Sequence, residues 1–140
     1  MATPMRLTKS ATPANLTLFL TLVDVFADRH ALAGASRGDL RLLAEEACTN
    51  VVMHAYPSRE AGDLTLELGY EDGVAVITLE DDGVAFGPDD APSPEIDADW
   101  ESRREGGVGW HLIRTLSDEL SYERAADRNR LTIRKRVTPA

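Results

Sequence analysis

A carboxylate and an amide lie four residues apart in a segment whose other periodic positions are apolar. Residues 40–56 repeat leucine, alanine and valine at helical spacing, which predicts a helix packed on the core. Glu46 and Asn50 fall on one flank of that apolar stripe, with His54 one turn further on. A half-buried carboxylate beside an amide costs free energy unless something polar binds there. A carboxylate can deprotonate a nucleophile and an amide oxygen suits a hard cation such as Mg²⁺, although an isolated pair of this kind is more often an ordinary polar flank.

A second polar segment directly follows an apolar strand and begins with Asp81-Asp82-Gly83. An aspartate at the end of a strand can accept a hydrogen bond from an exocyclic amine, such as that of adenine. Gly83 would let the backbone approach a ring closely. Taken alone, the segment reads equally well as a turn, because Asp and Gly are common in turns.

Glycines at positions 106, 107 and 109 open a helix that we expect to run from Trp110 to about Glu119. Amide groups at a helix N-terminus, together with the helix dipole, form a cradle for phosphate. The spacing matches neither the Walker motif nor a dinucleotide-binding fingerprint. The alternative is a hinge at the end of the preceding loop, residues 87–105.

Two more helices are expected in the first third of the chain. Thr12 caps a helix that starts at Pro13 and stops near Gly34. Ser36 caps the next helix, with Asp39 three residues later in a capping-box-like arrangement, and Pro57 ends it.

Five strands are expected around these helices. An initial edge strand covers residues 5–8, and an alternating strand from Leu64 is joined by the Asp72-Gly73 hairpin turn to a more central strand, residues 74–80. Two final strands, residues 120–124 and 130–137, are joined by a turn at 127–129. This order predicts an α+β two-layer sandwich, a mixed β-sheet with helices packed on one face.

Composition limits the class of protein. A chain of 140 residues forms one domain, and a net charge of −9 argues against general nucleic-acid binding. Cys48 is the only cysteine, which excludes an intramolecular disulfide and a cysteine zinc cluster. No stretch approaches the ~18 apolar residues of a membrane span, and no signal segment opens the chain. We therefore expect a cytoplasmic protein that does not bind a membrane.

Each polar segment is weak evidence alone, but their order is specific. Together they resemble the GHKL ATPase fold of gyrase, histidine kinases and MutL. The matching order is an acid and an amide on a helix, a strand followed by Asp-x-Gly, a long loop and a helix that begins with Gly-Gly-x-Gly. Within that fold, residues 13–136 resemble the anti-sigma factor serine/threonine kinases of the RsbW and SpoIIAB type. EEACTNVVMHAYP resembles the N box of that family, and GGVGWHLIRTLSDEL resembles its second glycine box.

The resemblance implies roles for individual residues. Glu46 would be the general base, Asn50 the Mg²⁺ ligand and Asp81 the group that reads adenine. The other nucleotide-binding residues would be Gly83, Ala85, Gly106, Gly107, Val108 and Gly109. The loop 87–105 would be a nucleotide lid. Its only arginines are Arg103 and Arg104, so a cation for the terminal phosphate would come from these two or from elsewhere in the protein.

Two departures from the family pattern stand out. Ala85 replaces the second glycine of a D-x-G-x-G box. The final strand of relatives often carries a threonine near adenine, and the matching place here is Asn129 or Arg130, because Thr132 has the wrong parity.

The resemblance implies a homodimer that uses ATP and Mg²⁺ and acts on other proteins. It would phosphorylate a serine or threonine on a STAS-type antagonist, the anti-anti-sigma protein, and sequester a sigma factor. The alternative is a non-catalytic ATP-sensing module that binds the same partners. Both functions need the same pocket, so the sequence alone does not separate them.

Overall fold

The computed structural model describes residues 3–88 and 109–140. Several predicted features lie outside these ranges: Gly106, Gly107, Val108, Arg103, Arg104 and the whole predicted lid except Gly87 and Pro88.

A five-stranded sheet forms one layer of the molecule, in the spatial order β1-β2-β3-β5-β4. Its strands are β1 (Met5–Ser10), β2 (Asp63–Glu71), β3 (Val74–Asp81), β4 (Glu119–Ala125) and β5 (Arg128–Arg136). β1 is an edge strand and β3 is central, as the sequence predicts.

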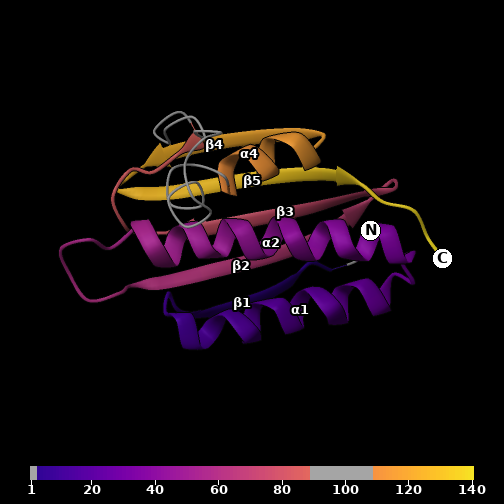
Figure 1. Ribbon diagram of the computed structural model, residues 1–140, viewed down its shortest axis with the longest axis horizontal. Helices are drawn as coiled ribbons and strands as arrows, with labels where there is room; N and C mark the ends of the chain where they lie inside the picture. Colours follow the sequence, from indigo (N-terminus) through magenta and orange to yellow (C-terminus); the bar gives the residue numbers. More distant parts are fainter. Residues whose placement is uncertain (1–2, 89–108) are drawn as a thin grey trace, which may run out of the picture.

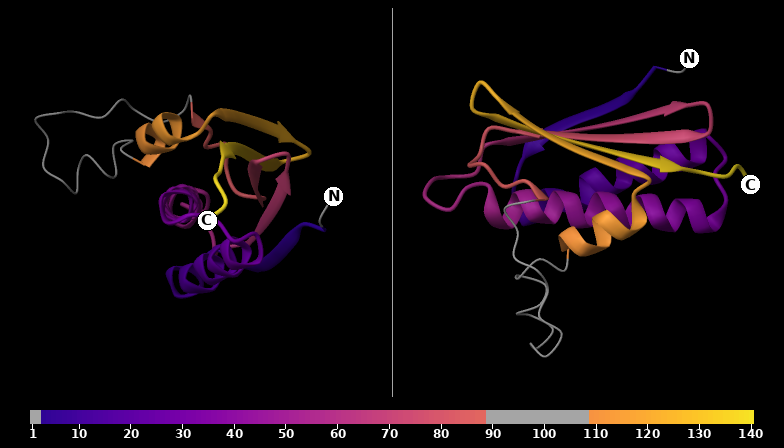
Figure 2. Two further views of the ribbon diagram at one scale, coloured as in Figure 1. Left: turned by 90° about the vertical axis from the view of Figure 1, so that its right-hand side faces the viewer. Right: turned by 90° about the horizontal axis from the view of Figure 1, so that it is seen from above.

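Helices form the second layer, all on one face of the sheet (Figures 1 and 2). They are the short 3₁₀ helix η1 (Pro13–Asn15), α1 (Leu16–Arg29), α2 (Gly34–His54) and α4 (Gly109–Leu116). Apolar side chains at alternate positions of both strands are fully buried in one cluster with Phe19, Phe26 and Leu43 of the helices: Leu64, Leu66 and Leu68 of β2, and Ile77 and Leu79 of β3. Burying one such side chain contributes about 1.5–3 kcal/mol, so this interlayer core holds α2 on the sheet. None of the helices in the described ranges has the length and apolar content needed to cross a membrane.

The predicted α+β two-layer architecture is confirmed, but the sheet is not mixed. All four neighbouring strand pairs are antiparallel. Two helices rather than one connect β1 to β2. A crossover through a single helix returns the chain parallel to the strand that it left, whereas two successive helices return it antiparallel to that strand.

Helix starts differ from the capping predictions. α2 begins at Gly34, so Ser36 lies inside the helix, where its hydroxyl accepts a hydrogen bond from the Thr138 N–H at 2.8 Å. Thr12 makes no side-chain cap bond, and the chain passes through η1 before α1 begins at Leu16. The C-terminal tail thus uses the hydroxyl of Ser36 that the sequence assigns to a helix cap.

Tight turns join the two hairpins. Asp72 and Gly73 have φ values of 51° and 79°, which confirms the predicted turn. In the second hairpin the left-handed residues are Ala126 and Asp127, with φ values of 51° and 59°. The turn is therefore earlier than predicted, and Asn129 belongs to β5, where it pairs with Asp81 of β3.

Candidate functional site

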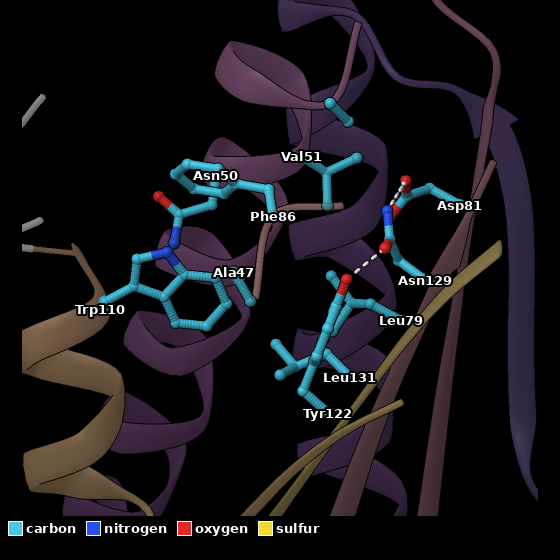
Figure 3. Close-up of a pocket in the computed structure, with 11 residues that line it drawn as sticks. Ala47, Asn50, Val51, Leu79, Asp81, Phe86, Trp110, Tyr122, Asn129 and Leu131 are labelled. Atoms are coloured by element: carbon cyan, nitrogen blue, oxygen red, sulfur yellow. Dashed lines mark hydrogen bonds between the residues drawn. The ribbon is translucent and has the colours of Figure 1, made fainter. Parts of the chain in front are cut away.

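A pocket lies between α2, α4 and one end of the central strands (Figure 3). Its apolar wall comprises Ala47, Val51, Leu79, Phe86 and Leu131. Its polar groups come from Asn50, Asp81, Trp110, Tyr122 and Asn129. Concave, mostly apolar sites with a few convergent polar groups are typical of small-molecule binding.

The predicted acid and amide meet the start of α4 at one end of the pocket. Glu46 is 4% exposed. A Cβ on Gly109 would lie 3.0 Å from Glu46 Oε2 and 3.2 Å from Asn50 Oδ1. A larger residue at this position would make tight contacts with both side chains, which would have to shift by a few tenths of an ångström. The structure thus brings together three of the predicted site residues.

Two buried donors lack partners at this end of the pocket. Within the described ranges, neither Asn50 Nδ2 nor Trp110 Nε1 has a hydrogen-bond acceptor. A buried unsatisfied donor costs about 1–3 kcal/mol, which a ligand with acceptor oxygens would relieve. These observations fit a phosphate-bearing ligand.

Asn50 fits magnesium bound together with a ligand's phosphates. In the described part of the chain, no cluster of three His, Cys, Asp or Glu side chains could hold a metal ion. Mg²⁺ commonly takes only one or two protein oxygens and completes its shell with phosphates and water. The single amide oxygen of Asn50, close to the start of α4 at Gly109, is consistent with that chemistry.

Asp81 lies at the opposite end, where β3 ends. It is 4% exposed, and its Oδ1 accepts hydrogen bonds from the Gly83 N–H and from Asn129 Nδ2, both at 2.9 Å. Oδ2 accepts none from the described residues and belongs to a side chain that lines the pocket. This geometry suits an acceptor for the amine of a bound base.

Comparison with known proteins agrees with this geometry. A model of the histidine kinase-like ATPase domain matches residues 9–135. The chain belongs to this family. The predicted resemblance to RsbW-type kinases is also confirmed by the curated relatives of this ATPase domain.

The serine-protein kinase RsbW of Bacillus mycoides is 35% identical over 111 residues, which cover 72% of this chain and 64% of the relative. RsbW of Bacillus subtilis is 36% identical over 94 residues, covering 61% and 56%. The serine/threonine-protein kinase BtrW of Bordetella bronchiseptica is 29% identical over 130 residues, covering 93% and 92%. The ATPase domain thus spans less than two thirds of these RsbW proteins.

Solved structures agree on the fold. The RsbU and RsbW domains of a Mycobacterium tuberculosis protein superpose with a TM-score of 0.70 at 15% identity, covering 99% of this chain and 34% of that one. A blue-light activated histidine kinase of Erythrobacter litoralis gives 0.56 at 22% identity, covering 89% and 41%.

The first glycine box of this ATPase domain packs on the end of α2. A Cβ on Gly83 would lie 2.3 Å from the Ala55 carbonyl oxygen, and the next residue, Val84, donates its N–H to that oxygen at 2.8 Å. Gly83 is therefore needed for packing between two backbone segments. Ala85 is exposed and does not line the pocket.

A cluster of Tyr56, Arg59 and Asp82 supports the same segment and is absent from the sequence prediction. The Tyr56 hydroxyl donates to Asp82 Oδ1 at 2.8 Å, and Arg59 pairs with that oxygen at 2.9 Å while lying over the Tyr56 ring. Bonds from Tyr56 and then Arg59 lower the pKa of Asp82. Burial, followed by the bond to Asp82, raises the pKa of Tyr56. Tyr56 and Arg59 follow α2 in the sequence, and no pattern there predicts that they contact Asp82 beside the glycine box.

Aromatic side chains wall the pocket and are also new from the structure. Phe86 stacks on His54 of α2 with ring centroids 4.5 Å apart, and it lies 6.1 Å from the Trp110 ring. The stack shows that His54 packs against Phe86 at the end of α2.

Proposed function

We propose that this chain binds Mg·ATP in the pocket and transfers the γ-phosphoryl group to a serine or threonine of an antagonist protein. The observation that carries the proposal is the meeting of Glu46 and Gly109 with Asn50, which lines one end of a pocket whose other end presents Asp81. Along one bound nucleotide, Glu46 would activate the substrate hydroxyl, Asn50 would bind the metal ion and Asp81 would bind the base.

The adenine end would work through one hydrogen bond and apolar contact. Asp81 Oδ2 accepts a hydrogen bond from the exocyclic amine, while Leu79, Val51 and Leu131 exclude water from the ring faces. Oδ1 stays bonded to Gly83 and Asn129 and keeps the carboxylate in place.

The phosphate end would work through charge and position. Bound Mg²⁺ supplies charge neutralisation of the phosphate oxygens, and Asn50 Oδ1 would be its protein ligand. Glu46 takes the proton of the substrate hydroxyl as the oxygen–phosphorus bond forms and the bond to the ADP leaving group breaks. The N-terminus of α4, which begins at Gly109, would hold developing negative charge through its backbone amides and the helix dipole.

The names of the relatives support kinase activity, since RsbW and BtrW are called serine or serine/threonine kinases. By analogy with that family, the antagonist would be a STAS-type anti-anti-sigma protein and the second partner a sigma factor. We also propose a homodimer working in the cytoplasm.

Transfer of label from [γ-³²P]ATP tests the proposal directly. The full chain is incubated with Mg·ATP and a candidate STAS-type antagonist, with the antagonist's acceptor serine or threonine replaced by alanine as control. We expect label on the wild-type antagonist only, and none with excess EDTA. Nucleotide binding without transfer to any candidate would support the non-catalytic module, and no binding at millimolar Mg·ATP would reject the site.

A further inference from the structure

Asn129 joins the strands and the loop at the adenine end of the pocket. It is 6% exposed and lies in β5 directly opposite Asp81 of β3 (Figure 3). Its Nδ2 donates to Asp81 Oδ1 at 2.9 Å and to the Val84 carbonyl at 2.8 Å. Its Oδ1 accepts from Arg124 Nη1 at 2.9 Å and from the Tyr122 hydroxyl. Nδ2 also donates to the Gly83 carbonyl at 3.5 Å, so the amide has three acceptors at one end and two donors at the other.

These partners allow only one orientation of the amide. A guanidinium has no acceptor and a backbone carbonyl has no donor. Turning the amide over would set Nδ2 against Arg124 and Oδ1 against the carbonyls, losing bonds at both ends. Asn129 therefore always presents a donor to Asp81.

That donor determines which oxygen of Asp81 a ligand meets. The Gly83 N–H and Asn129 Nδ2 both bond to Oδ1, so two anchors on different elements hold the carboxylate plane. Oδ2 is then the oxygen left to accept a bond in the pocket. With the Gly83 amide as sole anchor, the carboxylate could rotate about its terminal torsion, which is soft.

We infer that Asn129 is a positioning residue that makes the site select 6-amino over 6-keto purine nucleotides. The inference rests on the proposed function, since it concerns the base of the bound nucleotide. Adenine offers a donor at position 6, whereas guanine and hypoxanthine offer an acceptor there. A fixed carboxylate oxygen bonds the first and repels the second, and a site built around such a bond discriminates strongly.

Calorimetric titration with Mg·ATP and with Mg·ITP, its 6-keto counterpart, tests this selection. Wild type should prefer ATP, and Asn129→Leu, which keeps the approximate size but removes the donor, should lower the ATP-to-ITP affinity ratio by about tenfold or more. Thr132→Val is the matched control. Thr132 lies in the same strand as Asn129 and pairs with Thr78 of β3, but it is on the opposite face of the sheet from Leu131 and Ile133, away from the pocket. Its ratio should equal that of wild type.

A second variant keeps the test decisive if Asn129→Leu fails to fold. Arg124 is exposed, so Arg124→Met should fold while removing one of the two donors that orient the Asn129 amide. It should lower the ratio in the same direction, by less. A folded Asn129→Leu variant with the wild-type ATP-to-ITP affinity ratio would overturn the inference. If Asn129→Leu does not fold, an unchanged ratio in Arg124→Met would overturn it instead. If wild type fails to bind Mg·ATP, the proposed function itself is wrong.

Discussion

Glu46 and Asp81 are both 4% exposed carboxylates, and their surroundings give them different tasks. Asp81 is bonded through one oxygen to the Gly83 amide and to Asn129, which holds it as a fixed acceptor. Glu46 instead lies against the start of α4, beside the amide oxygen of Asn50. Under the proposed function, base recognition by Asp81 and proton transfer by Glu46 would therefore take place at separate points along the pocket.

Substitutions of Glu46 and Asn50 should separate catalysis from metal binding. Glu46→Gln should keep Mg·ATP affinity and lower phosphoryl transfer by about 10²-fold or more, because general-base catalysis contributes that much. Asn50→Ala should lower Mg²⁺-dependent affinity by at least about tenfold, since even the groups that support a metal ligand are worth that factor. Calorimetry and single-turnover transfer measure the two effects, and equal transfer rates for wild type and Glu46→Gln would reject the proposed base.

Acid should weaken the Tyr56–Asp82 contact. The pKa of Asp82 is lowered in the folded chain by Tyr56 and Arg59, so its contribution to stability is present above the ordinary value of 3.8 and is lost as pH falls through the folded pKa. The effect should be no more than about 1 kcal/mol, because the Asp82 side chain is 43% exposed. Urea unfolding at neutral pH and below the folded pKa should show a smaller acid loss for Tyr56→Phe than for wild type. An identical loss would mean that this hydrogen bond does not contribute.

At the scale of elements, the site depends on how closely α4 approaches α2. The first residue of α4 is Gly109, and the helix packs its buried Trp110 and Ile113 inward. Gly109 faces Glu46 and Asn50 and has no side chain to hold the helices apart. The distance between α2 and α4 at the site therefore depends on this one residue.

Gly109→Ala should therefore lower nucleotide affinity, because the new Cβ would lie 3.0 Å from Glu46 Oε2 and push the carboxylate or the helix start aside. Gly38→Ala is the matched control in α2, where no atom lies within 4 Å of the added Cβ. That variant should leave binding unchanged and stabilise the fold by about 0.5–1 kcal/mol through better helix propensity. Equal Mg·ATP affinities for Gly109→Ala and wild type would show that α4 does not form part of the site.

At the scale of the whole molecule, the pocket connects parts of the chain that are far apart in sequence. Its lining runs from Ala47 in α2 to Leu131 in β5 and includes α4. A ligand held there contacts both layers of the sandwich at one end. Binding should therefore stabilise the entire fold rather than one segment.

Mg·ATP should raise the melting temperature of the full chain. At a ligand concentration of about 100 times Kd, binding adds about 2.7 kcal/mol to the free energy of unfolding. For a domain of this size that corresponds to roughly 8 °C. Thermal scans with ATP plus EDTA should show a smaller shift, and no shift at millimolar Mg·ATP would contradict binding in the pocket.

Much of the fold and part of the site could be predicted from the chain alone. Hydrophobic periodicity predicts α2 and the β2–β3 hairpin, because burial of a repeated apolar face is a local property of sequence. Glu46, Asn50 and Asp81 could be predicted for a related reason, since polar groups at otherwise buried positions are costly without a ligand.

Tertiary structure alone decided the remainder. Ser36 looks like a helix cap, yet it bonds to the C-terminal tail, 102 residues away. Asn129 falls in the predicted turn and is also one of two positions matched to the threonine near adenine. The hairpin turns earlier, and the pairing of β3 with β5 sets Asn129, not Arg130, against Asp81. The antiparallel direction of the β1–β2 pair likewise follows from the path of the chain through two helices. These contacts join residues far apart in sequence, and neither local propensity nor periodicity carries information about which distant group a side chain will meet.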